Sequence, residues 1–492
     1  SFSNARGRRL ITPVMIVCYS IPPMFYAIGY ALVGSGRAGS GNDLFMMLTG
    51  SHTAPFNFTS FWGLIFVSVL RSTTFAYILL IGPVSTLGKG QDEAARIFGG
   101  RPMLRFWMIL ASLKPAFIAT AVLVTIASVQ VFDAVYILGT SSGIHTLSTL
   151  TYSFLNQQYV DFAGASALGS MLLGLVVILI MIQNRATRDG RFTTVAVKPE
   201  ARLRLDLGPW RVAVDLFLLV WALFAIVLPV VSLAVTSLIR FPGVYDTLSL
   251  TNYAMVWSNS QTYAALRTTA ILATLGSTAA VCFALLMINM RKRLKAPGAR
   301  SLLDMIMLAP KVMHGIVTAV AFIWAVTLFG PTRELYGTVW LLFLALTVSV
   351  IPVAYMLTTG AFAQLDPALD DAARISGDTP VGIQLRVQIP LLAPSLINAW
   401  FLCAVAIAGA LDVPLVLGSA SLRVVASTVF EYFTFNGNYG ASAAMLMLTL
   451  LVFAATALVL HVLVLLIRPD LRAGLIRRLR PGAKAPRQEI PA

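Results

Sequence analysis

Long apolar runs separated by short polar segments make up most of the chain. Each run is long enough to cross the ~30 Å hydrocarbon layer of a membrane as an α-helix. The runs lack the two-residue alternation of membrane β-strands, and a helix satisfies its own backbone hydrogen bonds in lipid. The pattern predicts an all-α polytopic membrane protein with ten visible spans, at about 10–33, 61–86, 114–138, 163–183, 212–238, 265–290, 302–328, 337–359, 393–417 and 441–467.

Composition and charge agree with this pattern. Of the 492 residues, 58% are hydrophobic and 11% are charged, whereas soluble proteins carry about a quarter charged residues. If residue 1 lies in the cytoplasm, 29 of the 36 Lys and Arg residues fall in cytoplasmic segments. The others are Arg37, Arg240, Arg333 and Arg423 on the outer side, and Arg71, Arg267 and Lys311 within or at the edge of spans. This asymmetry follows the positive-inside rule and sets the predicted orientation.

The remaining composition excludes several function classes. The net charge of +16 follows from the loop asymmetry, so it indicates attraction to anionic lipid rather than nucleic-acid binding. Three cysteines lie in spans and four histidines are scattered, with no metal-ligand spacing. The chain has no Walker A loop and no hydrolytic triad. We therefore expect no catalytic residue, no metal site and no cofactor bound by this chain, which would not be an enzyme.

A short polar phrase occurs twice between apolar runs. "DEAARIFGG" begins at Asp92 and "DDAARISGD" begins at Asp370. Downstream, "VFDAVYILG" (131–139) and "ALDVPLVLG" (410–418) match with Asp133 opposite Asp412, and "FAGASALGSM" (162–171) matches "YGASAAMLML" (439–448). Upstream, "RGRRLITPVM" (6–15) resembles "PGARSLLDMI" (297–306). The chain is therefore predicted to contain two parallel repeats with the same membrane orientation.

The two predicted halves are unequal. The second has six spans and the first has four, because two spans precede the segment that matches the start of the chain. We expect that two spans are absent from the N-terminus and that the parent has twelve; a natural ten-span protein with a processed start is the alternative. The predicted domains are 1–187, a cytoplasmic linker at 188–210, a second domain at 211–470 and a basic cytoplasmic tail at 471–492.

The repeated phrase predicts a short helix in a cytoplasmic loop. In the first copy Asp92 can cap the helix and Glu93 favours its first turn. Gly99 and Gly100 end it, and Pro102 starts another helix. A single copy is typical of an ordinary capped loop helix, whereas two copies at equivalent places favour docking of a partner.

This pattern resembles the "EAA" loop of membrane permease subunits of type I ABC importers. In that family Glu-Ala-Ala is followed by Gly six residues after the Glu and then by Ile-x-Leu-Pro. The residues that match, or flank the match, are Glu93, Ala94, Ala95, Arg96, Gly99 and Ile109 in the first copy, and Asp371, Ala372, Ala373, Arg374, Gly377 and Pro390 in the second. Ala111 and Ser112 replace Leu-Pro in the first copy, and Asp371 replaces Glu in the second. The resemblance implies two tandem permease bundles of the MetI-like type.

The resemblance also implies partners and a location. The loops at 92–99 and 370–377 would each seat in one subunit of a homodimeric cytoplasmic ABC ATPase, which binds ATP and Mg. A periplasmic binding protein would deliver solute from outside. The chain would lie in the bacterial inner membrane, with both loops in the cytoplasm.

Charged residues inside a membrane indicate a transport pathway or an internal ion pair. Arg71 and Lys311 lie within predicted spans, with His314 three residues after Lys311 and therefore predicted on the same helix face. Asp133 and Asp412 approach the outer ends of paired spans. Arg71 and Lys311 could contact an anionic solute while the aspartates shape an outer gate; alternatively, the cations and aspartates neutralise one another.

The substrate is left open by the sequence. The fused layout resembles the ferric-iron permease group, which places iron(III) first, with relatives that carry 2-aminoethylphosphonate, thiamine, polyamines or sugars. Intramembrane Arg71 and Lys311 fit an anion better than a bare cation. The alternative class is an ion-coupled secondary transporter, which also uses repeats and midplane charges.

Overall fold

The computed structural model describes residues 7–36, 39–85, 107, 111, 113–187, 210–240, 243, 245, 248–363, 365–419 and 422–467, and the structural statements below concern these residues. The secondary-structure elements of these residues are helices. The two β-contacts among them are isolated bridges, one between Ile239 and Leu248 and one between Ser419 and Leu422. The structure thus confirms the all-α prediction.

Seven helical segments in the described part of the chain are long and apolar enough to cross a membrane. Two of them contain a π-helical turn, at Leu223–Val227 between α10 and α11 and at Ile383–Gln388 before α19. The seven segments are α4 (Phe61–Ser85), α9 (Phe162–Thr187), α10 (Trp210–Ala222) with α11 (Leu228–Leu238), α13 (Ser260–Arg293), α16 (Val339–Phe362), α19 (Ile389–Ala408) and α22 (Tyr439–Ile467).

Two predicted spans are broken rather than continuous. The span predicted at 10–33 consists of α1 (Arg8–Ser20) and α2 (Pro23–Val33), bent by 93°. The span predicted at 302–328 consists of α14 (Pro297–Leu308), a 3-10 turn (Ala309–Lys311) and α15 (Gly315–Leu328), bent by 104°. Prolines stand at both breaks and lack the N–H that would continue the helix.

Two further predicted spans are longer than the helices that the structure contains at those places. The apolar helix α7 (Lys114–Val129) ends nine residues before the predicted limit of 138, and α19 ends nine residues before 417. The residues that follow form a π-helical turn (Val135–Gly139) and the short helix α20 (Asp412–Leu417). The same interruption occurs just before each repeated aspartate, so it belongs to the repeat.

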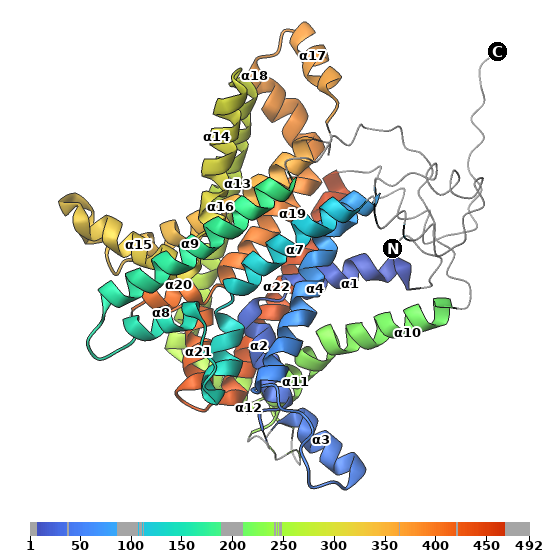
Figure 1. The fold of residues 1–492 in the computed structure, drawn as a ribbon, viewed down its shortest axis with the longest axis vertical. Helices are drawn as coiled ribbons and strands as arrows, with labels where there is room; N and C mark the ends of the chain where they lie inside the picture. The colour runs from blue at the N-terminus through green and yellow to red at the C-terminus, as the bar shows by residue number, and fades with distance from the viewer. Residues whose placement is uncertain are drawn as a thin grey trace.

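Short helices complete the described chain. They are α3 (Ser40–Thr49), a 3-10 turn (Thr140–Ser142), α8 (Leu147–Leu155), α12 (Thr251–Ser258), a 3-10 turn (Gly330–Leu335), α17 (Pro367–Ile375), α18 (Pro380–Gly382) and α21 (Val425–Thr434). Figure 1 shows α17 at one end of the long axis, beyond α13 and α14, and α3 at the opposite end.

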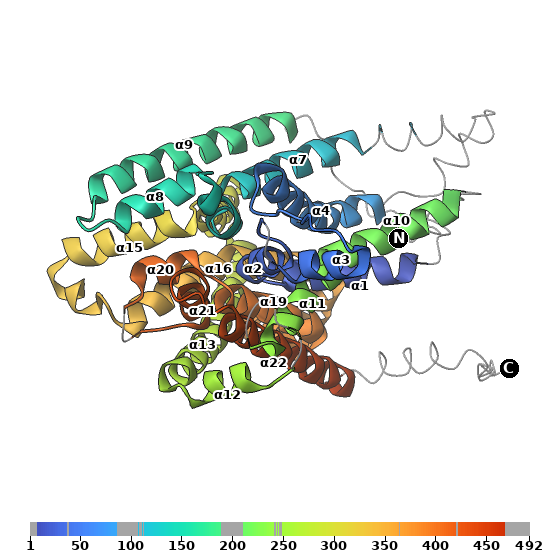
Figure 2. The same ribbon diagram turned by 90° about the horizontal axis from the view of Figure 1, so that it is seen from below.

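The two halves repeat the same helix order. The series α1/α2, α4, α7, α8, α9 corresponds to α14/α15, α16, α19, α21, α22. Equivalent pairs are in contact in both halves: α4 with α7 and α16 with α19, α8 with α9 and α21 with α22. Helices α10, α11, α12 and α13 have no counterpart among the described residues of the first half. Figure 2 shows α4, α7, α8 and α9 as one layer, on the opposite side of the molecule from α12, α13 and α22.

The halves are joined by packing as well as by sequence. Helix α11 of the second half contacts α2 of the first, and α15 contacts α8 and α9. Gly29 of α2 lies so close to Pro229 of α11 that a Cβ on it would be 2.8 Å from the proline Cβ. The faces turned outward carry large apolar side chains, as expected for helices in lipid.

The predicted domain limits are outside what the structure can test. The linker at 188–210 lies outside the described residues except for Trp210, the first residue of α10, and so does the tail at 471–492. These boundaries stay predictions.

Candidate functional site

The second repeated loop folds into the helix α17. Asp366 caps it by accepting a hydrogen bond from the backbone N–H of Ala368 at 2.9 Å, and Pro367 occupies the first turn. The cap lies four residues before Asp370, the counterpart of Asp92. Gly377 ends the motif with a positive φ of 81°, a conformation that favours glycine.

The surface of α17 is exposed to solvent. Asp371, Ala372 and Arg374 are exposed, and the ion pair between Arg374 and Asp371 is long, at 4.0 Å. Ile375 is 88% exposed, although it is a large apolar residue. Helix α17, which lies at one end of the molecule, thus presents an apolar side chain to solvent at Ile375.

Polar contacts connect α17 to the helix bundle. Asp378 accepts a hydrogen bond from the N–H of Thr379 at 3.0 Å and lies 3.8 Å from Arg386. Gln384, buried in the π-helical turn, accepts a hydrogen bond from the Asn289 side chain of α13. Pro390 follows in the first turn of α19. These contacts join the segment that follows α17 to the π-helical turn before α19 and to α13.

The first repeated loop cannot be compared directly. Glu93, Ala94, Ala95, Arg96 and Gly99 lie outside the described residues. Their assignment to partner docking stays a prediction.

The break between α1 and α2 is stabilised by Arg71. Its Nη1 donates a hydrogen bond of 2.8 Å to the carbonyl oxygen of Ile21, and its guanidinium lies 5.9 Å from the centre of the Tyr19 ring. Carbonyl groups at a helix C-terminus have no partner in the helix and carry partial negative charge. Arg71 therefore caps the end of α1 inside the apolar region.

The break between α14 and α15 is held from the other half. Nε2 of Gln130, just after α7, donates to the carbonyl oxygen of Val312 at 2.7 Å. The residue equivalent to Gln130 is Gly409, which packs against Pro22 at the first break so closely that a Cβ on it would be 2.3 Å from the proline Cβ. Equivalent residues of the two halves thus each contact the broken span of the opposite half.

The repeated aspartates lie beside these breaks. The carboxylate of Asp412 abuts Gly315, where a Cβ would be 1.8 Å from Oδ2, at the N-terminus of α15. A helix N-terminus favours a carboxylate, and Oδ1 also accepts from the N–H of Val413 at 2.9 Å. Asp133 is close enough to interact electrostatically with both Asp412 and Arg71.

His314 lies at the break between α14 and α15, next to contacts with both repeats. It directly precedes Gly315, and its ring centre lies 6.2 Å from that of Phe132, the neighbour of Asp133. The side chain is only 6% exposed, and its Nε2 has no hydrogen-bond partner among the described residues. We refer to Asp133, Asp412 and His314 as the axial cluster.

The structure separates the predicted pathway residues into two groups. It brings Asp133, Asp412, His314 and Arg71 together, whereas the side chain of Lys311 is exposed. The prediction that Lys311 and His314 share a helix face is wrong, because the 3-10 turn ends at Lys311 and α15 begins only at Gly315. The partner of Arg71 is a backbone carbonyl, which neither sequence hypothesis anticipated.

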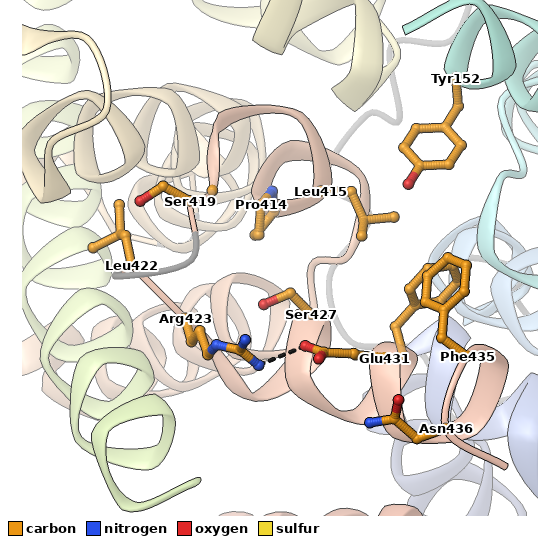
Figure 3. Close-up of a pocket in the computed structure, with 12 residues that line it drawn as sticks. Tyr152, Pro414, Leu415, Ser419, Leu422, Arg423, Ser427, Glu431, Phe435 and Asn436 are labelled. Carbon is orange, nitrogen blue, oxygen red and sulfur yellow. Dashed lines mark hydrogen bonds and ion pairs between the residues drawn. The ribbon is translucent and has the colours of Figure 1, made fainter. Parts of the chain in front are cut away.

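A cavity of about 450 Å³ is lined by α20, α21 and the segments beside them, together with one residue of α8. Figure 3 shows Tyr152 reaching toward it from α8 of the first half, while the other labelled residues come from the second half. Arg423 and Glu431 form an ion pair of 2.5 Å on its wall. Burial raises the pKa of the Tyr152 hydroxyl to about 12, so at neutral pH it stays protonated and able to donate a hydrogen bond.

Sequence reasoning missed Gln130, Gly409 and the ion pair of Arg291 with Asp304. Gln130 is polar at the end of an otherwise apolar helix and aligns with Gly409 in the repeat, which could have indicated a special position. Arg291 Nε lies 2.8 Å from Asp304, near the inner ends of α13 and α14. Among the described residues, no group of three or more His, Cys, Asp or Glu side chains is placed to hold a metal ion.

Comparison with known proteins adds evidence on the family. A family model described as "Binding-protein-dependent transport system inner membrane component" matches residues 1–188 and 273–472. Among curated relatives, the ferric transport system permease protein FbpB of Actinobacillus pleuropneumoniae is 24% identical over 430 residues, covering 86% of this chain and 61% of the relative. The probable ABC transporter permease protein y4fN of Sinorhizobium fredii is 25% identical, covering 69% of this chain and 61% of that protein.

Other similarities are more distant. The trehalose/maltose transport system permease protein MalF of Thermococcus litoralis is 25% identical over 195 residues, covering 38% of this chain and 64% of the relative. A solved bacterial ABC transporter involved in the import of the acidic polysaccharide alginate is 14% identical, with a TM-score of 0.44 over 51% of this chain and 93% of that one. The chain spans about three fifths of the length of the first curated relatives it matches.

Proposed function

The chain belongs to the family of binding-protein-dependent transport system inner membrane components, and from this premise we propose that it forms the translocation pathway of an ATP-driven importer in the bacterial inner membrane. A periplasmic binding protein would deliver the solute, and a cytoplasmic ATPase homodimer would bind ATP and Mg. The observation that carries this proposal is the family match in two segments, because each segment contains one copy of the repeated loop.

The proposed mechanism follows the contacts from α17 inward. An ATPase subunit seated on α17 would move it, and the Asp378–Arg386 and Asn289–Gln384 contacts would carry the movement into α19 and α13. At the far end of α19, Gly409 packs against Pro22 at the first break. One continuous series of contacts thus connects the docking helix of the second half with the broken span of the first.

The broken spans are the proposed moving parts of the pathway. Half-helices that end inside a membrane present backbone dipoles toward a cavity, and transporters use such breaks at their solute sites. Here Asp412 lies against the second break, and Asp133 interacts electrostatically with Arg71, which holds the first, so movement of either half would change the surroundings of the two aspartates.

Iron(III) is the first substrate candidate. Relatives in two organisms, at 22–25% identity, are named as ferric transport permeases. An anionic or organic solute carried by the same machinery, such as 2-aminoethylphosphonate, thiamine, a polyamine or a sugar, is the second candidate, since relatives named for sugar transport also match. The family match favours an importer of either kind over an ion-coupled secondary transporter.

Reconstitution tests the proposal. The full chain, its ATPase and its binding protein would be placed in liposomes, with ATP hydrolysis and uptake of radioactive iron measured together. We expect both to depend on the loaded binding protein. Uptake driven by an ion gradient without ATP would contradict the importer assignment, whereas stimulation by another solute but not by iron would replace only the substrate.

The docking loops have a separate test. The double substitution Glu93→Lys with Asp371→Lys should abolish solute-stimulated ATP hydrolysis, because it reverses charge at both predicted contacts. Asp161→Lys, a carboxylate in a predicted outer loop, is the control. Normal stimulation in the double variant would overturn the docking assignment.

A further inference from the structure

The structure indicates whether the solute that passes through the pathway is a cation or an anion. The sequence places two cations and two aspartates inside spans and does not say which pair faces a solute. An anion would need a cation that is available to it, and a cationic solute would need an available carboxylate.

The two cations are not arranged to receive an anion at the axial cluster. The Arg71 guanidinium donates to the Ile21 carbonyl oxygen at 2.8 Å and lies over the Tyr19 ring, so its interactions support the end of α1. Lys311 lies at the 3-10 turn before the break and is not among the charges that act on Asp133 or His314. Arg71 acts on Asp133 from a distance, as a partial counter-charge.

The two carboxylates are arranged differently. Asp133 and Asp412 come from equivalent positions of the two repeats and interact with each other. Like charges that lie close together in a medium of low dielectric repel each other, and a cation relieves the repulsion. A proton can supply that charge in the empty protein, and a cationic solute would replace it.

His314 gives an independent sign of a missing ligand. Its side chain is 6% exposed, so it is more than nine-tenths buried, and its Nε2 lacks a partner in the described part of the chain. Leaving a buried polar atom unpaired is energetically unfavourable, and such atoms in native structures need an explanation. His314 directly precedes Gly315, against which the Asp412 carboxylate lies, so the unpaired atom belongs to the residue next to that contact.

We propose that the axial cluster of Asp133, Asp412 and His314 is the point at which the pathway selects solute by charge, and that it accepts cationic solutes. This inference rests on the proposed transport function and narrows its substrate class, favouring iron(III), a polyamine or another cation over phosphonates and acidic sugars. The cluster is a passage site rather than a chelating site, because the described residues hold no group of three ligands close enough for a metal ion.

The test measures the local potential without knowledge of the solute. Cys18, Cys282 and Cys403 are first replaced by Ala in the full chain, and Ala410→Cys then places one thiol two residues before Asp412. Reaction rates with a cationic trimethylammonium-ethyl and an anionic sulfonatoethyl methanethiosulfonate are measured, each relative to its rate with a free thiol. Gln157→Cys, in an exposed loop, is the matched control for the position of the thiol.

We expect the cationic reagent to react at least about tenfold faster than the anionic one at Ala410→Cys, and near equally at Gln157→Cys. Asp133→Asn with Asp412→Asn should bring the ratio close to one, whereas Glu431→Gln in the outer cavity should leave it high. A ratio at or below one, or a high ratio that persists in the double Asn variant, would overturn the proposal. Absence of reaction with both reagents would also overturn it, because no aqueous path would then reach the cluster.

Two further measurements, the salt dependence of the rate ratio and the stimulated ATPase activity, distinguish failure of the charge assignment from failure of the variant or of the importer function. If the double Asn variant does not fold, the ratio in the parent must fall as ionic strength rises, since screening weakens an electrostatic preference; a ratio that ignores salt contradicts the proposal. ATP hydrolysis stimulated by the binding protein is measured on the same samples. A normal ATPase response with no charge preference would refute the cation assignment alone, whereas no ATPase response would refute the importer function.

Discussion

The side chain of Gln130 donates a hydrogen bond of 2.7 Å to the backbone carbonyl of Val312, across the boundary between the two repeats. The donor follows α7 of the first half, and the acceptor lies where the third span of the second half is broken. In the equivalent place of the second half, Gly409 has no side chain to donate and packs directly on Pro22. The two breaks are therefore held by different interactions, and the pseudo-symmetric halves are expected to respond unequally.

Removing the amide of Gln130 tests this difference. Gln130→Leu keeps the approximate volume and loses the donor, so we expect the free energy of unfolding to fall by about 1 kcal/mol, the usual net value of such a bond. Reversible unfolding in SDS measures it. Gln157→Leu in an exposed loop is the control, and equal unfolding free energies for the two variants would show that the Gln130 contact contributes nothing.

We expect the main effect of replacing Arg71 to be a loss of folding stability rather than a loss of solute affinity. Arg71→Met removes a charged donor from the end of α1, which should cost about 1.5–3 kcal/mol, and Arg71→Lys should restore part of this loss. Arg267→Met, an exposed arginine of α13, serves as the control. If Arg71 instead contacts an anionic solute, Arg71→Met would leave unfolding unchanged and lower solute affinity.

The helical segments and their register could be predicted from sequence, because both depend on local patterns. In the described residues the ten predicted segments correspond to seven helices long enough to span, two bent pairs and the shorter apolar helix α7. The two polar phrases aligned α4 with α16 and α7 with α19. The equivalence of Asp133 and Asp412 followed from the same alignment. In the structure Asp133 interacts electrostatically with Asp412, whereas their place near a pseudo-twofold axis stays a prediction.

The breaks and their partners could not be predicted in the same way. Proline within a membrane span can kink a helix or end it, and neighbouring helices decide which. At Pro22 the outcome depends on Arg71 and Gly409, which lie about 50 and 390 positions away in the chain. The i, i+3 relation of Lys311 and His314 failed for the same reason, since it assumed a helix that tertiary contacts interrupt.

Tyr355 and Tyr77 occupy equivalent positions in the two repeats. They form a matched pair for measuring how much a tyrosine hydrogen bond near the inner helix ends contributes to stability. Tyr355 donates to the Asp304 carboxylate at 2.5 Å, whereas the hydroxyls of Tyr77 and Thr12 are 2.7 Å apart. A bond to a charged acceptor contributes about 1.5–3 kcal/mol and one between neutral groups about 1 kcal/mol. Tyr355→Phe should therefore lower the unfolding free energy more than Tyr77→Phe does, with Tyr159→Phe, at an exposed position, as control. The reverse order would show that the Arg291–Asp304–Tyr355 contacts do not stabilise these helix ends.

Ile375 is expected to contribute strongly to docking and little to folding. Its side chain is 88% exposed at the end of α17, so Ile375→Ser should change the unfolding free energy by less than about 0.5 kcal/mol. An apolar side chain buried at the centre of an interface contributes about 2 kcal/mol or more, which corresponds to at least about a tenfold loss of affinity for the ATPase. Binding of the purified ATPase to the full chain in nanodiscs measures this loss, and Val381→Ser, an exposed apolar residue of the neighbouring α18, is the matched control. The counterpart of Ile375 in the first repeat is Ile97, so Ile97→Ser should weaken the second ATPase contact and the double variant should lose binding. Unchanged affinity in the double variant would show that the ATPase contacts another surface.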